Sequence, residues 1–96
     1  MLTKSVILKY LKENKKSLQK QYNIKEIALY GSYAKDKQSQ TSDIDLLISS
    51  DTSVSDIEKF REKLFSHFHT NIDILEERNI FIPTIKLMIK RECIYV

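Results

Sequence analysis

The chain has 96 residues, a length typical of one domain, so we expect a single domain over residues 1–96. Its 42% apolar, 30% charged and 9% aromatic residues exclude disordered, collagen-like and coiled-coil chains. The net charge is +3, and the single cysteine, Cys93, excludes an intrachain disulfide and a cysteine-based zinc site. No apolar run reaches the ~18 residues of a membrane span, and residues 1–10 lack the features of a signal peptide. We therefore expect a cytoplasmic protein with no membrane contact.

The charge is unevenly distributed along the chain. Residues 1–40 carry nine lysines and three acidic residues, a net charge of +6, whereas residues 41–96 carry a net charge of −3. A basic half is compatible with an anionic partner, and equally with a solvated lysine-rich helix face. Direct nucleic-acid binding is not the favoured interpretation.

The first half of the chain predicts two helical elements that alternate with two strands. In chain order these are a helix over 3–20, a strand over 24–30, a helical turn over 32–37 and a strand over 43–48. Asn23 is expected to end the first helix, and the polar residues 38–42 form a loop before the second strand.

The second half predicts two more helices and up to two more strands. In chain order these are a helix over about 55–68, a strand over 71–75, a helix whose first turn contains Pro83 and a closing strand over 94–96. Residues 49–53 form a turn, and the capping-box spacing of Ser55 and Glu58 places the helix start near residue 55. The element order predicts an α/β protein of the α+β type, a small mixed β-sheet with helices packed against it.

Gly31 and Ser32 form the first candidate binding element. Gly31 is the only glycine of the sequence, and without a Cβ it lets a phosphate approach the backbone closely. Ser32 adds a hydroxyl donor, and the backbone N–H groups of the following turn point to the same place, which predicts an anion cradle. Lys35 follows and would neutralise phosphate charge. An ordinary strand-to-helix turn beside a surface lysine remains the alternative.

Asp43 and Asp45 form the second candidate element. Alternate residues of a strand point to one face with Cα atoms about 6.6–6.8 Å apart, so both carboxylates can converge on one site. At the mouth of a buried strand they would repel each other unless a cation compensates. Mg²⁺ prefers carboxylate oxygens and bridges phosphates, and two ions can clamp a phosphoryl displacement. A turn cap and a solvent-facing strand end are the alternative roles.

Asp73 is the third acid, between two isoleucines of the third predicted strand. If that strand lies beside the second, Asp73 faces the Asp43 and Asp45 pair and could accept a proton from an attacking hydroxyl. Glu76 and Glu77 are rivals for this role, and a water-facing acid on an edge strand is the alternative.

The remaining candidates are interpreted as structural. Phe60, Phe65 and Phe68 recur at helical spacing and are predicted core residues. Cys93 is predicted to be buried, and Tyr33 is expected to be exposed beside the Gly31 turn.

The spacing of these motifs resembles a known signature. Gly31-Ser32, ten residues and then Asp43-Ile44-Asp45 is similar to the pattern of the polymerase-β-type nucleotidyltransferase superfamily. The amino-acid sequence of residues 31–35 and 41–47 resembles one branch of it, the minimal nucleotidyltransferases. These are small proteins usually found with a HEPN-domain partner.

The resemblance implies a nucleotidyltransferase fold and a set of roles. Asp43 and Asp45 would bind two Mg²⁺ ions, with Asp73 as the third carboxylate, and Gly31 and Ser32 would hold the triphosphate of ATP. It also implies an antitoxin that transfers AMP to a tyrosine hydroxyl of a HEPN toxin, a ribonuclease, and so silences it.

Two residues depart from the family pattern. Members usually have Arg and then Gly where this chain has Lys35 and Asp36. Lysine lacks the bidentate fork of arginine, and Asp36 adds negative charge near the triphosphate. A protein that neutralises its partner by binding alone therefore stays a second hypothesis. A drug- or nucleotide-directed transferase, or an RNA-binding protein that uses the basic first helix, is a third.

Overall fold

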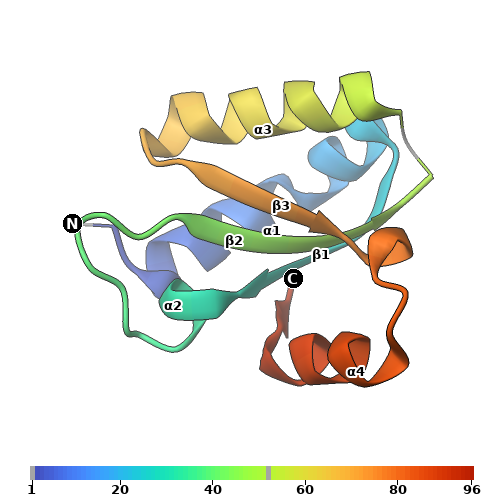
Figure 1. Ribbon diagram of the computed structural model, residues 1–96. Coiled ribbons are helices and arrows are strands. Elements are labelled where there is room, and N and C mark those ends of the chain that lie inside the picture. Colours follow the sequence, from blue (N-terminus) through green and yellow to red (C-terminus); the bar gives the residue numbers. More distant parts are fainter. Residues whose placement is uncertain (1, 52) are drawn as a thin grey trace.

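The chain folds around a four-stranded sheet, shown in Figure 1. The structure, a computed structural model, describes residues 2–51 and 53–96. Its elements in chain order are α1 (Lys4–Tyr22), β1 (Ile24–Tyr30), α2 (Gly31–Ala34), β2 (Ile44–Ser50), α3 (Val54–Phe68), β3 (Ile72–Glu76), the 3₁₀ turn η1 (Glu77–Asn79), α4 (Pro83–Glu92) and β4 (Ile94–Tyr95). The predicted order is confirmed, including the closing strand. None of the helices described is long and apolar enough to cross a bilayer.

The sheet is mixed, with the strand order β3-β2-β1-β4. β2 runs parallel to β3 and antiparallel to β1, and β4 pairs antiparallel with β1. The register places Asp45 opposite Tyr30 on β1 and opposite Asp73 on β3. The mixed sheet with packed helices confirms the α+β class. The register brings the end of β1 together with the starts of β2 and β3.

One face of the sheet carries the hydrophobic core. α1 and α3 pack on this face (Figure 1), and alternate residues of β1 and β2 point into it because successive side chains of a strand point to opposite faces. Its fully buried residues include Ile7, Leu11, Leu18, Ile27, Leu29, Ile44, Leu46, Ile48, Phe60 and Leu64.

The opposite face is covered differently. α4 lies on this side of the sheet (Figure 1), and none of its residues is buried. Asp45 and Leu47 of β2 point to this side because they alternate with the core residues of that strand. Leu47 is buried, whereas Asp45 is half-buried.

The ends of the helices differ in detail from the sequence expectations. Asn23 ends α1, as predicted, and it does so in the left-handed conformation. α3 begins at Val54, and Ser53 caps it by accepting a hydrogen bond from the Asp56 backbone N–H, so the predicted capping box starting at Ser55 is wrong by two residues. Residue 52, within the predicted turn, lies outside the described residues.

Two aromatic assignments were wrong. Tyr33 is only 5% exposed and belongs to the core cluster rather than facing solvent, because α2 lies against β1 and β2. Phe65 is 51% exposed, whereas Phe60 is fully buried and Phe68 packs at the margin of the core. Cys93 is half-buried rather than buried. Helical periodicity identifies which residues share one face of α3, but it does not show which of them the sheet covers.

Candidate active site

The turn between β1 and α2 strongly favours glycine at its first position. Gly31 has φ +76°, a conformation that L side chains rarely adopt. A Cβ on this residue would overlap Oδ2 of Asp45 and would lie 3.0 Å from its Cγ. Gly31 is therefore required by the close approach of a carboxylate from the neighbouring strand, a reason that the sequence alone did not reveal.

α2 is a single helical turn that follows directly from β1. It begins at Gly31, one residue earlier than predicted, and closes through hydrogen bonds from the Lys35 N–H to the Gly31 and Ser32 carbonyls, each 3.2 Å. The Lys37 N–H also donates to the Ser32 carbonyl at 2.9 Å. N–H groups in the first turn of a helix have no partner within the helix, so Ser32 and its neighbours present donors at this end of the sheet.

Asp45 and Asp73 lie side by side across β2 and β3. They are register partners in the parallel pairing. Burial, the charges of Asp73 and Asp43 and a hydrogen bond in which Asp45 donates to Asp73 raise the pKa of Asp45 to about 6. The arrangement favours a proton or a cation between the two carboxyl groups, because two adjacent charged carboxylates repel each other.

Asp43 stands at the edge of this pair. It precedes β2 by one residue and is exposed, and its charge contributes to the raised pKa of Asp45. Over residues 2–51 and 53–96, no group of three or more His, Cys, Asp or Glu side chains is arranged to hold a metal ion. The fold thus supplies a close pair of carboxylates with a third nearby, rather than a closed set of three ligands.

The chemistry of this donor set fits a hard divalent cation. All three side chains offer carboxylate oxygens, which suit Mg²⁺ better than zinc or copper. The raised pKa of Asp45 reflects its burial and the negative charges of Asp73 and Asp43, which a bound cation would compensate. Glu76 and Glu77, the rival acids, are engaged elsewhere: Glu76 pairs with Arg78, and Glu77 pairs with Lys86 and Lys90 of α4.

Tyr30 is a site residue that the sequence analysis missed. Tyr30 lies opposite Asp45 in the pairing of β1 with β2. Burial and the charges of Asp45 and Asp73 raise the pKa of its hydroxyl to about 12. Its position in the sequence could have identified it: Tyr30 is the last residue of β1, directly before Gly31, and its side chain lies on the face of the sheet opposite the core.

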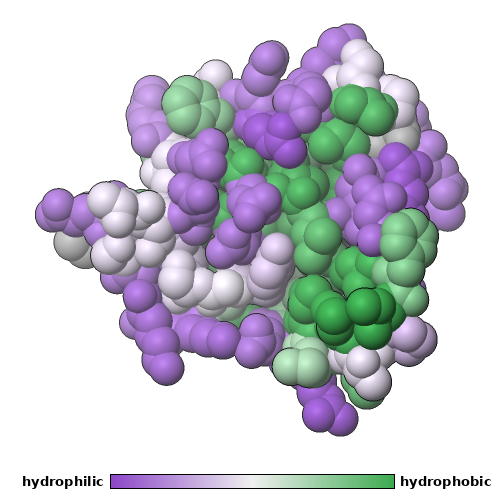
Figure 2. Space-filling view, viewed as in Figure 1, coloured by the Kyte–Doolittle hydropathy of each residue, from purple (hydrophilic) through white to green (hydrophobic). Residues whose placement is uncertain are grey.

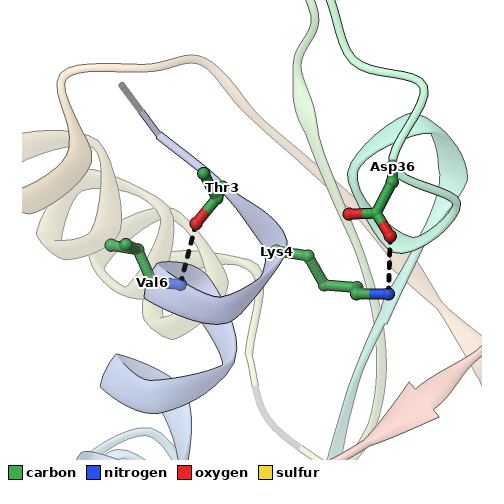
Figure 3. A network of polar contacts seen from close by, with 4 residues as sticks. All are labelled: Thr3, Lys4, Val6 and Asp36. Carbon is green, nitrogen blue, oxygen red and sulfur yellow. Dashed lines mark hydrogen bonds and ion pairs between the residues drawn. The ribbon is translucent and has the colours of Figure 1, made fainter.

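Lys35 and Asp36 each have an ionic partner from another part of the chain. The Lys35 Nζ lies 2.9 Å from Oε1 of Glu92 at the end of α4. Asp36 has φ +57°, and its Oδ2 accepts a hydrogen bond from the Nζ of Lys4 at 2.8 Å. Figure 3 shows Lys4 reaching from the first turn of α1 to Asp36. The negative charge that the sequence analysis expected beside the site is therefore compensated by Lys4.

Comparison with known proteins gives one family match. Residues 8–96 match the nucleotidyltransferase domain family. A curated relative from Methanocaldococcus jannaschii, provisionally named a protein adenylyltransferase, is 34% identical over 98 residues, which cover the full length of both chains.

Solved structures share the fold. A protein provisionally described as a minimal nucleotidyltransferase superposes with a TM-score of 0.81 at 23% identity, covering 97% of this chain and 95% of its own. A toxin–antitoxin crystal structure with AMP-PNP contains a chain that matches with a TM-score of 0.66 at 22% identity, covering 98% of this chain and 72% of that one. At these identities the likeness concerns the fold.

Proposed function

The chain belongs to the nucleotidyltransferase domain family, and from that premise we propose that it transfers AMP from ATP to a hydroxyl group of a partner protein. The observation that carries the proposal is the pairing of Asp45 with Asp73 directly beside the Gly31 turn. Carboxylates and backbone N–H donors then meet at one end of the sheet, as transfer from a nucleoside triphosphate requires.

The proposed reaction forms one bond and breaks one. The acceptor oxygen attacks the α-phosphorus of ATP, the bond from that phosphorus to the bridging oxygen breaks, and pyrophosphate leaves. Asp73, which is exposed, accepts the proton of the acceptor hydroxyl. Asp43, Asp45 and Asp73 would hold two Mg²⁺ ions, which neutralise phosphate charge when bound.

The triphosphate is assigned to the turn. Gly31 lets the turn lie directly against Asp45, Ser32 offers its hydroxyl and N–H, and Lys35 supplies a positive charge after release from Glu92. Half of the Lys35 side chain is already exposed, so exchanging one surface ion pair for another costs little free energy.

The acceptor is proposed to be a HEPN-domain toxin encoded beside this chain, with a tyrosine as the modified residue. The proposal rests on the sequence resemblance and is supported by the fold shared with a chain of a toxin–antitoxin structure. In this reading the protein is an antitoxin, and the attached AMP silences the toxin.

A second candidate function is neutralisation by contact alone. It is favoured by one observation: the lysine assigned to the triphosphate is paired with Glu92, and it replaces the arginine usual in the family. Retention of all three carboxylates favours the enzyme.

The deciding experiment is mass spectrometry of the neighbouring-gene protein after incubation with this chain, ATP and Mg²⁺. One or more added AMP units are expected, and none with the Asp43→Asn, Asp45→Asn double variant. Asp51→Asn is the matched control, because Asp51 is an exposed carboxylate, paired with Lys25, just beyond the far end of β2. A stable complex without added AMP would support the contact antitoxin instead.

A further inference from the structure

α4 and the segment before it carry an exposed apolar surface, which we call the α4 patch and define as Phe81, Ile82, Ile85, Leu87 and Met88. Phe81 is 84% exposed and Met88 65% exposed. Figure 2 shows strongly hydrophobic residues gathered in the part of the visible face where Figure 1 places α4. Contiguous patches of large apolar residues on a small protein mark interaction sites.

The attachment of α4 explains why its apolar side chains stay exposed. Glu77 holds the helix through Lys86 at 3.3 Å and Lys90 at 2.9 Å. Beside it lies a groove of about 300 Å³ lined mainly by apolar residues, including Leu75 and Ile89. A ten-residue helix has little stability of its own, so this one depends on these ion pairs and on its contacts along the groove, while none of its residues is buried.

The α4 patch lies on the same side of the sheet as the carboxylates. Leu75 lines the groove and pairs in register with Leu47. Leu47 is two residues along β2 from Asp45, a separation of about 7 Å. At its far end α4 touches the nucleotide side of the site, where Glu92 pairs with Lys35. A protein seated on the patch would therefore cover the same face of the sheet as the reacting groups.

The charges around the patch distinguish between its possible occupants. Residues 76–92 carry four basic and three acidic side chains; Glu76 pairs with Arg78, and Glu77 pairs with both Lys86 and Lys90, which leaves a small net positive charge. In a two-fold dimer the same surface meets itself, so two surfaces of the same net positive charge would be brought together. A different protein with acidic groups around an apolar contact complements this surface better.

We propose that the α4 patch is the docking surface for the acceptor protein, a partner with an apolar contact surrounded by acidic side chains. The proposal rests on the proposed function and adds to it the place at which the acceptor is held. Docking here presents the acceptor hydroxyl to Asp73, while the nucleotide occupies the Gly31 side of the site.

The test measures binding and AMP transfer separately. Binding of the full chain to the purified neighbouring-gene protein is measured by titration calorimetry without ATP, so that the binding result does not depend on catalysis. Phe81→Asp with Met88→Asp is expected to weaken binding about 100-fold, the loss typical of central interface residues. Phe65→Asp is the matched control: Phe65 is half-exposed on α3, on the core side of the sheet, and binding is expected to stay within threefold of wild type.

A rim variant and a folding check accompany this pair. Arg91→Glu, at an exposed position beside the patch, is expected to weaken binding about 10-fold and less so at high salt. Thermal unfolding is expected to change little in all three variants, because each residue is substantially exposed.

Three results would overturn the docking proposal. The first is binding of the Phe81→Asp, Met88→Asp variant within threefold of wild type. The second is failure of the wild-type chain to bind the neighbouring-gene protein. The third is a dimer of this chain that the same double substitution converts to monomers.

The outcomes also separate docking from catalysis. Patch-dependent binding without AMP transfer would support docking and contradict the transferase. Undiminished AMP transfer by the Phe81→Asp, Met88→Asp variant would contradict docking and leave the transferase intact.

Discussion

The two faces of the sheet differ in how fully their side chains are buried. On the face covered by α1 and α3, large apolar residues such as Phe60 and Leu64 are fully buried. On the other face, Asp45 is half-buried beside a second carboxylate, and α4 buries none of its residues. The contrast teaches that stability is concentrated on one face, which leaves the other free to hold groups that are costly to bury but useful for binding and chemistry.

The largest expected effect compares one phenylalanine from each face. Phe60→Ala removes a fully buried ring and is expected to lower the free energy of unfolding by about 3–5 kcal/mol. Phe81→Ala, at a side chain 84% exposed, is expected to change it by less than about 0.5 kcal/mol. Urea unfolding followed by circular dichroism measures both. Similar losses from the two substitutions would show that α4 contributes to the core.

The next effect concerns the boundary between the faces. Gly31→Ala forces a Cβ into Asp45 at a positive φ and is expected to lower the free energy of unfolding by about 1–3 kcal/mol. Ser32→Ala, in the same turn, is the control and is expected to cost less than about 0.5 kcal/mol. Unchanged stability of Gly31→Ala would mean that the carboxylate approaches less closely than described.

Asp45→Asn is expected to stabilise the metal-free protein while abolishing AMP transfer. Removing one of two adjacent carboxylates relieves repulsion and desolvation, a gain of about 1 kcal/mol after allowance for solvent screening. Thermal unfolding at pH 8 with EDTA measures it, and Asp51→Asn, which breaks the exposed pair with Lys25, is expected to give no gain.

The pH dependence of that gain follows from the pKa shift. The pKa of Asp45 is raised from 3.8 to about 6 in the folded protein, so between these values the native state binds the proton more tightly than the unfolded state does. Wild-type stability therefore falls as the pH rises from about 4 to about 6. The advantage of Asp45→Asn is expected to be full above pH 6 and to vanish near pH 4. An advantage that does not vary with pH would contradict the repulsion.

The smallest expected effect concerns the Lys4–Asp36 pair, which ties α1 to the nucleotide turn. Lys4→Ala is expected to cost less than about 1 kcal/mol of stability, as for other exposed ion pairs. It is also expected to weaken ATP binding about two- to threefold by leaving the charge of Asp36 uncompensated. In an Asp36→Gly background the same substitution is expected to leave ATP affinity unchanged. An equal loss in both backgrounds would mean that Lys4 acts on the nucleotide itself.

Local sequence patterns predicted much of the fold and part of the candidate site. The alternation in β2 indicated that Asp43 and Asp45 share a face, and the lone glycine marked the turn. Contacts between distant segments could not be predicted from local patterns. Lys35 pairs with Glu92, and Lys4 pairs with Asp36, because α4 and α1 both lie near the turn that follows β1. The burial of Tyr33 was missed because it depends on how α2 lies against β1 and β2.

The alternation of β2 also limits how this chain can vary in length. Its even-numbered residues from Ile44 to Ile48 enter the core, and Asp45 and Leu47 between them face the other way. Inserting one residue between Asp45 and Leu46 would turn every later side chain to the wrong face. The loop over residues 38–42, by contrast, lies outside any helix or strand and can lengthen without changing the register. Insertions are therefore expected to be tolerated just before the carboxylates and excluded just after them.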